Sequence, residues 1–277
     1  MPIAGIAQGL GIGGGTTATI SGAPAGGGAF TNDYSVSFDG EEDYMDTGST
    51  FQSTVRGGFS VSFWMKFSSL GSGVYAPFGS WDDVADQNAF YISNPAGGQN
   101  VIYRLEVGSS KITLGALPTG GWTTDWHHIA VTCEQSGGSV VAKIYIDGVY
   151  KATASMTATL SSFANTQSIY VGARNRTDGR NAYFPGLVDE VAIFGSVLSD
   201  GGVSTGATAS GDIASIYNSG APGDIDDLSP VSWWRMGDSN PASAGTSVSL
   251  INDVAGSNNL TQSTASSQPT ISTNVPS

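Results

Sequence analysis

Residues 59–67, with the sequence FSVSFWMKF, decide the fold class of this chain. Every second residue from Phe59 to Phe67 is large and apolar, and three of the four residues between them are polar. Because successive side chains of a β-strand point to opposite faces of its sheet, the pattern predicts a strand with one buried face.

The same period of two recurs on both sides of this segment. It is found in YSVSFDG (34–40), AFYIS (89–93), VIYRLEV (101–107), KITLGAL (111–117), WHHIAVTCE (126–134), VVAKIYIDG (140–148), QSIYVGAR (167–174) and LVDEVAIFG (187–195). Turn residues such as Asp147-Gly148 separate the segments. Successive strands without long helices between them predict an all-β fold, an antiparallel β-sandwich. One short helix is expected from Ser210, which can cap it, to Gly220, which can end it.

Composition excludes several function classes. Only 12% of the 277 residues are charged, and 23 acids against 10 bases give a formal net charge of −13. Such a chain is repelled by phosphate groups, which argues against nucleic acid and anionic membranes as partners. The apolar stretches are also shorter than the roughly 20 residues that a membrane-spanning helix needs. The lone Cys133 excludes an internal disulfide and fits a buried strand position.

Residues 1–30 form a Gly-rich N-terminal arm in this interpretation. Glycine loses much backbone entropy on ordering, so the arm is not expected to fold alone. Four apolar residues in it are candidates for an assembly anchor that docks on a neighbouring chain: Ile3, Ile6, Leu10 and Ile12. A flexible linker is the alternative. The segment lacks the basic and continuous apolar regions of a secretory signal.

Residues 221–277 return to strand-like alternation in PVSWWRM (230–236), TSVSLIND (246–253) and NLTQST (259–264). About fifty residues are few for an independent β core, and no long linker precedes them. We therefore expect residues 31–277 to form one sandwich that residues 228–277 complete.

Seven blocks in one order carry a resemblance to a known family. They are SVSFDGEEDYMDTG (35–48), FSVSFWMKF (59–67), WHHIAVTC (126–133), IYIDGVYKAT (144–153), SIYVGAR (168–174), FPGLVDEVAIFGSVLS (184–199) and DIASIYNSG (212–220). The chain resembles laminin-G-like domains of the concanavalin A-like lectin/glucanase superfamily over residues 34–220. The resemblance implies a jelly-roll of two antiparallel sheets. In many such domains a block like residues 228–262 comes first, so its place at the end resembles a circular permutation.

The glutamates of the chain do not match the catalytic pattern of the related laminarinases. Those enzymes carry two glutamates on one strand, in an ExDxxE or ExDxE arrangement, as acid and nucleophile. The five glutamates here are Glu41, Glu42, Glu106, Glu134 and Glu190, and none has that spacing. Asp82, Asp83 and Asp86 are interpreted as a solvated acidic loop. His127 and His128 alternate across a strand without a recognisable Ser or Asp partner. The sequence therefore predicts a protein that is not an enzyme.

The resemblance also implies one structural calcium ion, which is bound by several hard oxygen ligands. Asp189 stands in the block whose acid recurs at the calcium site of related folds. Asp238, Asp253 and Asp43 are further candidate ligands. Strict alternation would place the side chains of Asp189 and Glu190 on opposite faces, so that only one of them could join the site.

Two groups of residues are candidates for glycan binding. The first surrounds SWDDVADQN and comprises Trp81, Asp82, Asn88 and Tyr91. The second comprises Arg174, Asn175, Arg176, Arg180 and Tyr183. Aromatic platforms beside polar side chains suit sugars, whereas Trp64, Trp126 and Trp233 are expected in the core.

The arm, the sandwich and the polar, charge-poor surface together resemble structural proteins on the particles of tailed bacteriophages. The sequence therefore predicts a non-enzymatic virion structural protein, a capsid decoration or fibre module on the virion surface. Its partners would be other virion proteins, further copies of itself and a host-surface glycan. The alternative is a secreted or cell-surface carbohydrate-binding module.

Overall fold

The computed structural model describes residues 30–71, 73–82, 88–94, 100–239 and 243–277. The predicted anchor residues and the two loop aspartates Asp83 and Asp86 lie outside the described residues. Everything below concerns the unit Thr31–Ser277. Within the described residues, no helix is long and apolar enough to cross a membrane.

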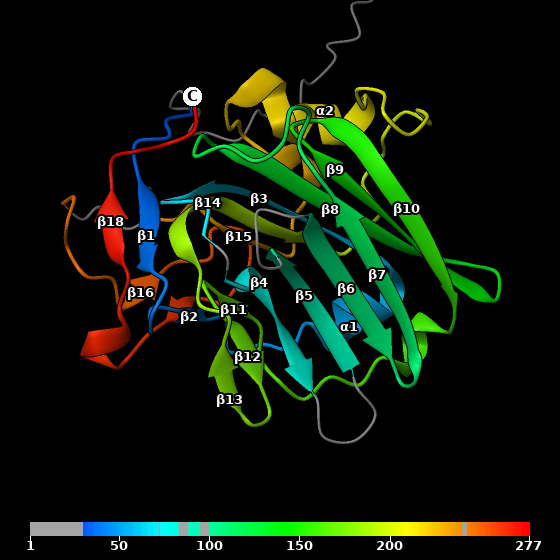
Figure 1. Cartoon of the computed structure of the whole chain (residues 1–277), viewed down its shortest axis with the longest axis horizontal. Coiled ribbons are helices and arrows are strands. Elements are labelled where there is room, and N and C mark those ends of the chain that lie inside the picture. Colours follow the sequence, from blue (N-terminus) through cyan, green and yellow to red (C-terminus); the bar gives the residue numbers. More distant parts are fainter. Residues whose placement is uncertain (1–29, 72, 83–87, 95–99, 240–242) are drawn as a thin grey trace, which may run out of the picture. The chain divides into compact units, whose positions relative to one another are not determined.

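Two sheets make up the described part of the domain (Figure 1). Sheet A has the order β10-β9-β8-β3-β14-β1-β18, and β15 also pairs with β14. Its strands are β1 (Ser35–Asp39), β3 (Phe59–Phe67), β8 (His127–Ser136), β9 (Ser139–Ile146), β10 (Val149–Thr157), β14 (Pro185–Phe194), β15 (Ser232–Trp234) and β18 (Thr270–Ser272). The strand that decides the fold class, β3, lies between β8 and β14 near the middle of this sheet.

Sheet B has the order β16-β17-β2-β11-β4-β5-β6-β7, and the hairpin β12–β13 joins it at β4. Its strands are β2 (Met45–Asp46), β4 (Tyr75–Asp82), β5 (Asn88–Asn94), β6 (Val101–Val107), β7 (Ser110–Ala116), β11 (Tyr170–Val171), β12 (Arg174–Arg176), β13 (Gly179–Asn181), β16 (Leu250–Ile251) and β17 (Leu260–Thr261). Strand pairing is antiparallel in both sheets, except that β12 runs parallel to β4.

The hydrophobic core lies between the inner faces of the two sheets. Phe59 and Phe63 of β3 contact Phe90 and Phe78 of sheet B, with ring centroids 4.9 Å and 6.2 Å apart. All four side chains are almost fully buried. Such aromatic pairs add about 0.5–1.5 kcal/mol each beyond the area they bury, so they hold the sheets in one relative position.

The C-terminal residues belong to both sheets. β18 extends sheet A beside β1, as the red and blue strands in Figure 1 show, while β15 pairs with β14. β16 and β17 extend sheet B beside β2. Trp234 of β15 is fully buried and meets Phe51 edge to face, with centroids 6.1 Å apart. Residues 228–277 therefore supply part of the main hydrophobic core.

The predicted fold class is confirmed as an antiparallel β-sandwich, and the expected helix is α2 (Gly211–Tyr217). A second short helix, α1 (Gln52–Gly57), begins after Phe51. Phe51 has a left-handed backbone and makes no side-chain capping bond, and phenylalanine at this position is not a residue that predicts a helix start. The remaining helical segments are the short 3-10 turns η1 (Leu160–Ser162), η2 (Asn218–Gly220), η3 (Asp226–Leu228) and η4 (Ala265–Ser267).

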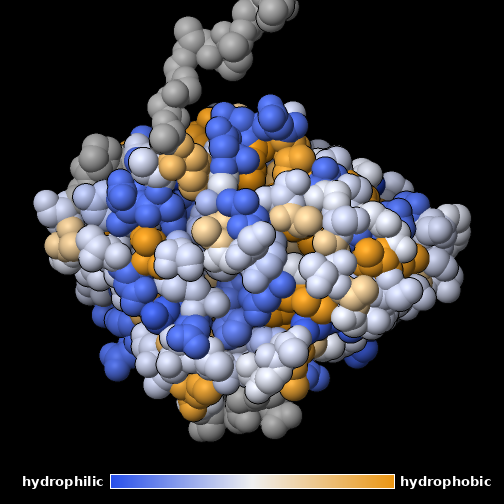
Figure 2. Space-filling model, turned by 90° about the horizontal axis from the view of Figure 1, so that it is seen from above, coloured by the Kyte–Doolittle hydropathy of each residue, from blue (hydrophilic) through white to orange (hydrophobic). Residues whose placement is uncertain are grey.

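The face seen in Figure 2 suits a chain with few charges. Hydrophobic side chains appear there in small separate patches between hydrophilic ones. Large apolar residues exposed on the described surface include Val197, Val231 and Val254, each less than half exposed. Isolated apolar residues of this kind are normal on a protein surface.

We predict that the domain does not fold without its C-terminal block. A fragment of residues 31–220 would lose β15 to β18 and leave the partners of Trp234, Ile251 and Ile271 uncovered. It should lack a cooperative transition in thermal and urea denaturation, whereas the full chain should show one. In the full chain, Trp234→Ala should cost about 3–5 kcal/mol of unfolding free energy. A 31–220 fragment that is soluble and melts cooperatively would contradict the prediction.

Candidate functional site

Two rows of side chains cover the outer face of sheet B. One row crosses five strands through directly paired residues: Tyr170, Gly79, Tyr91, Arg104 and Thr113. The next row contains Trp81, Ala89, Glu106 and Lys111. Their chain neighbours enter the core, so alternation points these side chains away from it.

Trp81, Tyr91 and Arg174 form the centre of this face. The guanidinium carbon of Arg174 lies 5.0 Å from the centroid of the Trp81 ring and 4.7 Å from that of the Tyr91 ring. Arg174 comes from β12, which runs parallel to β4 and carries it over the rows. Its Nε also donates to Asn181 Oδ1 at 3.0 Å. Cation–π contact and hydrogen bonding therefore hold the guanidinium in place.

Two further arginines flank this centre. The guanidinium of Arg176 lies 4.8 Å from the Trp81 ring and pairs with Asp178 at 3.0 Å. Arg104 pairs with Glu106, whose side chain is 1% exposed. We call Trp81, Tyr91, Arg104, Arg174 and Arg176 the arginine–aromatic cluster. Burial lowers the pKa of Arg174, and the neighbouring charges of Arg176 and Arg104 lower it further.

Gly79 allows this arrangement. A β-carbon at this position would lie 2.3 Å from Cβ of Tyr91, far inside van der Waals contact. The residue also has φ of +140°, a backbone conformation that residues other than glycine rarely adopt. Only glycine at position 79 lets Tyr91 pack close to β4.

The structure brings the two predicted glycan-binding groups together, although not every member faces outward. Asn88 is buried, and its Oδ1 accepts the backbone N–H of Ala164 at 3.0 Å. The carboxylate of Asp82 accepts hydrogen bonds from the hydroxyl groups of Thr166 and Thr177. Asn175 is also buried. These three residues support the loops beside the face.

The remaining two residues of the second group lie beside a tyrosine pair. Tyr44 and Tyr170 stack with centroids 4.6 Å apart, and Tyr183 packs against them. The guanidinium of Arg180 lies 4.5 Å from the Tyr44 ring. Because Tyr170 is in the same row as Gly79 and Tyr91, a row of mostly buried aromatic side chains continues from the arginine–aromatic cluster to this pair.

Sequence reasoning missed Arg104 and Glu106. The available signal was VIYRLEV, which places two charged residues two positions apart on one face of a strand in a chain that has few charges. That spacing favours an ion pair on one face of the strand, but nothing in the local sequence predicts that Tyr91 lies beside it.

A second candidate site is a cluster of three carboxylates, Asp189, Glu190 and Asp238, whose oxygens lie within 4.8 Å of one another. The expectation that Asp189 and Glu190 point to opposite faces is wrong. The pairing of β14 with β3 shifts register between Asp189 and Ala192, and Glu190 has φ of +46°. This bulge interrupts the alternation and turns both carboxylates to the same side.

The carboxylate cluster is buried and only partly neutralised. Asp189 accepts from Asn32 Nδ2 and from the backbone N–H of Glu190. Glu190 accepts from Trp233 Nε1 at 2.6 Å and from Arg235 Nε at 3.1 Å. Burial raises the pKa of Asp189 well above its usual range and that of Glu190 to about 7, although Arg235 opposes the shift at Glu190.

The cluster fits a hard divalent cation such as calcium. Within the described residues, Asp238 Oδ2 and Asn32 Oδ1 are buried oxygens without a hydrogen-bond donor. Asp238 Oδ2 is 3.9 Å from the nearest Arg235 nitrogen. One arginine cannot balance three ionised carboxylates, so the group needs bound protons or a cation.

The other two predicted metal ligands lie elsewhere. Asp253 accepts the backbone N–H groups of Trp233, Gly256 and Asn258 and so shapes its own turn. Asp43 accepts the backbone N–H of Asp39 at 3.0 Å. Neither belongs to the cluster of three carboxylates.

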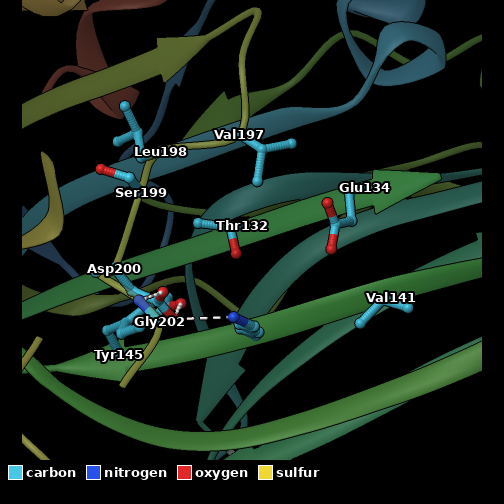
Figure 3. A pocket seen from close by; sticks show the side chains of 11 residues that line it. Thr132, Glu134, Val141, Tyr145, Val197, Leu198, Ser199, Asp200 and Gly202 are labelled. Atoms are coloured by element: carbon cyan, nitrogen blue, oxygen red, sulfur yellow. Dashed lines mark hydrogen bonds and ion pairs between the residues drawn. The ribbon is translucent and has the colours of Figure 1, made fainter. Parts of the chain in front are cut away.

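A hollow of about 270 Å³ lies on the outer face of sheet A, beneath the segment after β14 (Figure 3). Lys143 and Tyr145 both bind Asp200 there, at 2.9 Å and 2.7 Å. Figure 3 shows the side chains of Asp200 and Tyr145 next to each other in this hollow. Three polar side chains of this hollow, those of Lys143, Tyr145 and Asp200, are thus bonded to one another.

A second hollow of about 350 Å³ is lined by aromatic residues that include Trp64, Trp126 and Tyr217. His127 has partners in it, contrary to the sequence interpretation: its Nδ1 is 2.8 Å from Asp147 and its Nε2 is 3.2 Å from the Thr123 hydroxyl. Trp126 is only partly buried and donates to Asn274, so its expected core position is wrong. Trp64 and Trp233 are buried as expected.

Residues 39–204 match the family described as the concanavalin A-like lectin/glucanases superfamily, which covers more than half of the chain. This confirms the family resemblance seen in the sequence blocks. No curated protein matches the chain.

Solved structures with the same fold have low sequence identity to this chain. A candidate carbohydrate binding protein from Bacteroides ovatus has 15% identity and a TM-score of 0.56, with 89% of this chain and 62% of that one covered. The CBM40 of the Ruminococcus gnavus IT-sialidase, bound to α2,3-sialyllactose, has 16% identity and a TM-score of 0.49, with 60% and 91% covered. Identities at this level show the fold alone.

We predict that Gly79→Ala disrupts the arginine–aromatic cluster. The added methyl group must displace Tyr91, so the substitution should cost about 1–3 kcal/mol of unfolding free energy and alter Trp81 fluorescence. Gly179→Ala is the matched control, because Gly179 has φ of +128° and no atom within 4 Å of an added β-carbon. Equal effects of the two substitutions in urea denaturation would attribute the cost to backbone strain alone.

Proposed function

Since the chain belongs to the concanavalin A-like lectin/glucanases superfamily, we propose that it is a carbohydrate-binding module that holds its glycan on the outer face of sheet B. The observation that carries the proposal is the packing of Arg174 against both Trp81 and Tyr91. The Bacteroides ovatus structure, described as that of a candidate carbohydrate binding protein, agrees with the proposal at the level of fold.

The chemistry of this face suits a saccharide. Aromatic rings cover the apolar C–H faces of sugar rings, and guanidinium groups donate paired hydrogen bonds to sugar oxygens. The side chains are held before a ligand arrives, because Arg104 is paired with Glu106 and Arg176 with Asp178. Side chains that are already ordered lose less entropy on binding.

The proposed activity is binding without hydrolysis. Glu106 on the glycan-binding face is buried and paired with Arg104, which leaves it poorly placed to act as acid or nucleophile. Glu190 and Asp189 are close to each other but buried beneath the surface, where a polysaccharide does not reach. The laminarinase pattern is also missing from the sequence.

We propose that the position of residues 228–262 at the end of the chain reflects a circular permutation. The first and last strands of the described domain are neighbours, since Ser35 of β1 pairs with Ser272 of β18. Neighbouring ends are the condition under which a sandwich tolerates a permuted chain.

An extracellular or cell-surface position suits a glycan-binding module, and a virion surface would suit the same face. The virion setting rests on the N-terminal arm and its anchor residues, which lie outside the described residues. A structural protein of a particle would use the arm for assembly and the sandwich for contact with host glycans.

We expect Trp81→Ala to weaken glycan binding at least about tenfold, because the substitution removes both an aromatic platform and the ring that supports Arg174 and Arg176. A glycan array should identify a ligand, and calorimetry should then compare the variant with the unchanged protein. Reducing ends measured in the same incubations should not increase.

Trp126→Ala is the matched control, since Trp126 lines the hollow on the other sheet. It should bind as the unchanged protein does. If only Trp126→Ala lost binding, the site would lie in that hollow. Release of reducing sugar would contradict the non-enzymatic proposal.

We also propose that the carboxylate cluster holds one calcium ion with a structural role. Asp189 and Glu190 come from β14, while Asp238 follows β15 and Asn32 precedes β1. An ion bound by these residues would join three distant parts of the chain. It would also relieve the repulsion among three buried carboxylates.

Calcium should therefore raise the melting temperature of metal-free protein by mass action, and a chelator should reverse the increase. Asp189→Asn, which keeps the shape of the side chain but removes its charge, should abolish the response. Glu41→Gln, at an exposed residue, should keep it. An unchanged melting curve with calcium would show that the cluster is neutralised by protons instead.

A further inference from the structure

The outer face of sheet B has a charge balance opposite to that of the chain. Five of the ten basic residues lie on this face or on its β12–β13 hairpin, although the whole chain carries −13. These five are Arg104, Lys111, Arg174, Arg176 and Arg180. In a chain with 23 acids, this concentration places an anion-attracting field on the surface that also carries the aromatic rings.

Four acids lie on or beside this face, which leaves its five cations an excess of one positive charge. Glu106 is buried against Arg104, and Asp178 is paired with Arg176. Asp82 and Asp46 accept bonds from Thr166 and from the backbone N–H of Gly48. Arg174, Arg180 and Lys111 have no carboxylate partner in the ion pairs found among the described residues.

Two guanidinium groups share one ring at the centre of the face. Arg174 and Arg176 lie 5.0 Å and 4.8 Å from the centroid of Trp81. Burial lowers the pKa of Arg174, and the positive charge of Arg176 lowers it further, which shows that the two charges oppose each other. A bound anion would offset that repulsion. The indole ring accepts both cations through its π face but does not neutralise them.

From this arrangement we infer that the glycan bound on the outer face of sheet B is anionic, a saccharide that carries carboxylate or sulfate groups. The inference rests on the proposed function and specifies the class of its ligand. Carboxylate and sulfate share the property that matters here, two or more oxygens that accept paired hydrogen bonds from a guanidinium group. The aromatic rings would contact the sugar ring next to the charged group.

Matched pairs of oligosaccharides test the inference by calorimetry on the full chain. One pair is oligogalacturonate and its methyl ester, and the other is a sulfated galactan oligosaccharide and its desulfated form. The anionic member of at least one pair should bind about tenfold or more tightly than the neutral member. The pair that shows the difference identifies carboxylate or sulfate as the recognised group. Added salt should weaken this binding.

Arg176→Gln tests the site itself, because Arg176 is partly exposed and its loss leaves the buried Arg174 in place. Affinity for the anionic ligand should fall about tenfold, while affinity for its neutral partner should change less than about twofold. Lys66→Gln removes one positive charge from sheet A and is the matched control. Arg174→Lys keeps the charge but not the planar group, and it should also weaken binding.

The outcomes separate the inference from the function on which it rests. Equal affinity for the anionic and neutral members of both pairs would overturn the anionic preference and leave glycan binding standing. Equal loss in Arg176→Gln and Lys66→Gln would overturn the site, since the effect would then come from net charge. If no saccharide binds the correctly folded protein, the proposed function itself fails. Melting curves of all variants check that each is folded.

Discussion

The packing of sheet A against sheet B through large aromatic side chains is the constraint on which the rest of the structure depends. Phe59 and Phe63 of β3 meet Phe90 and Phe78 across the core. Because alternate residues of the same strands must point outward, the phenylalanines of β4 and β5 also determine where Trp81 and Tyr91 stand. The glycan-binding face is thus the reverse side of the core.

The low charge content of the whole chain makes the charged residues on that face distinctive. With only 12% charged residues, most of the surface relies on neutral polar groups, so a face that carries five of the ten cations stands out. Gly79 lets Tyr91 approach β4, and β12 carries Arg174 across both rings. Packing, backbone conformation and charge all act on the same few residues, which is the arrangement expected of a preorganised binding surface.

The carboxylate cluster differs from the glycan-binding face because it gathers negative charges and buries them. Asp189 and Glu190 are adjacent, buried and turned to one side by a bulge in β14. Burying like charges destabilises a fold unless a counter-charge is supplied. Arg235 supplies one such charge from beyond β15, and the cluster thereby connects the C-terminal block to the middle of sheet A.

Period-two alternation by itself determined the fold class and most of the longer strands, β3 among them, because each inward-facing side chain leaves a local signature. Alternation did not reveal β4, whose Pro77 and Gly79 are typical of turns, or β10, most of whose residues are only partly buried. It also placed Glu190 on the wrong face of its strand, because the bulge shifts the alternation of side chains and the alternating pattern of residue types does not show it. Trp81 and Arg174 were recognised separately, but they are 93 positions apart. Only the parallel pairing of β12 with β4 decided that they meet, because a contact between distant segments depends on strand order, which local sequence does not encode.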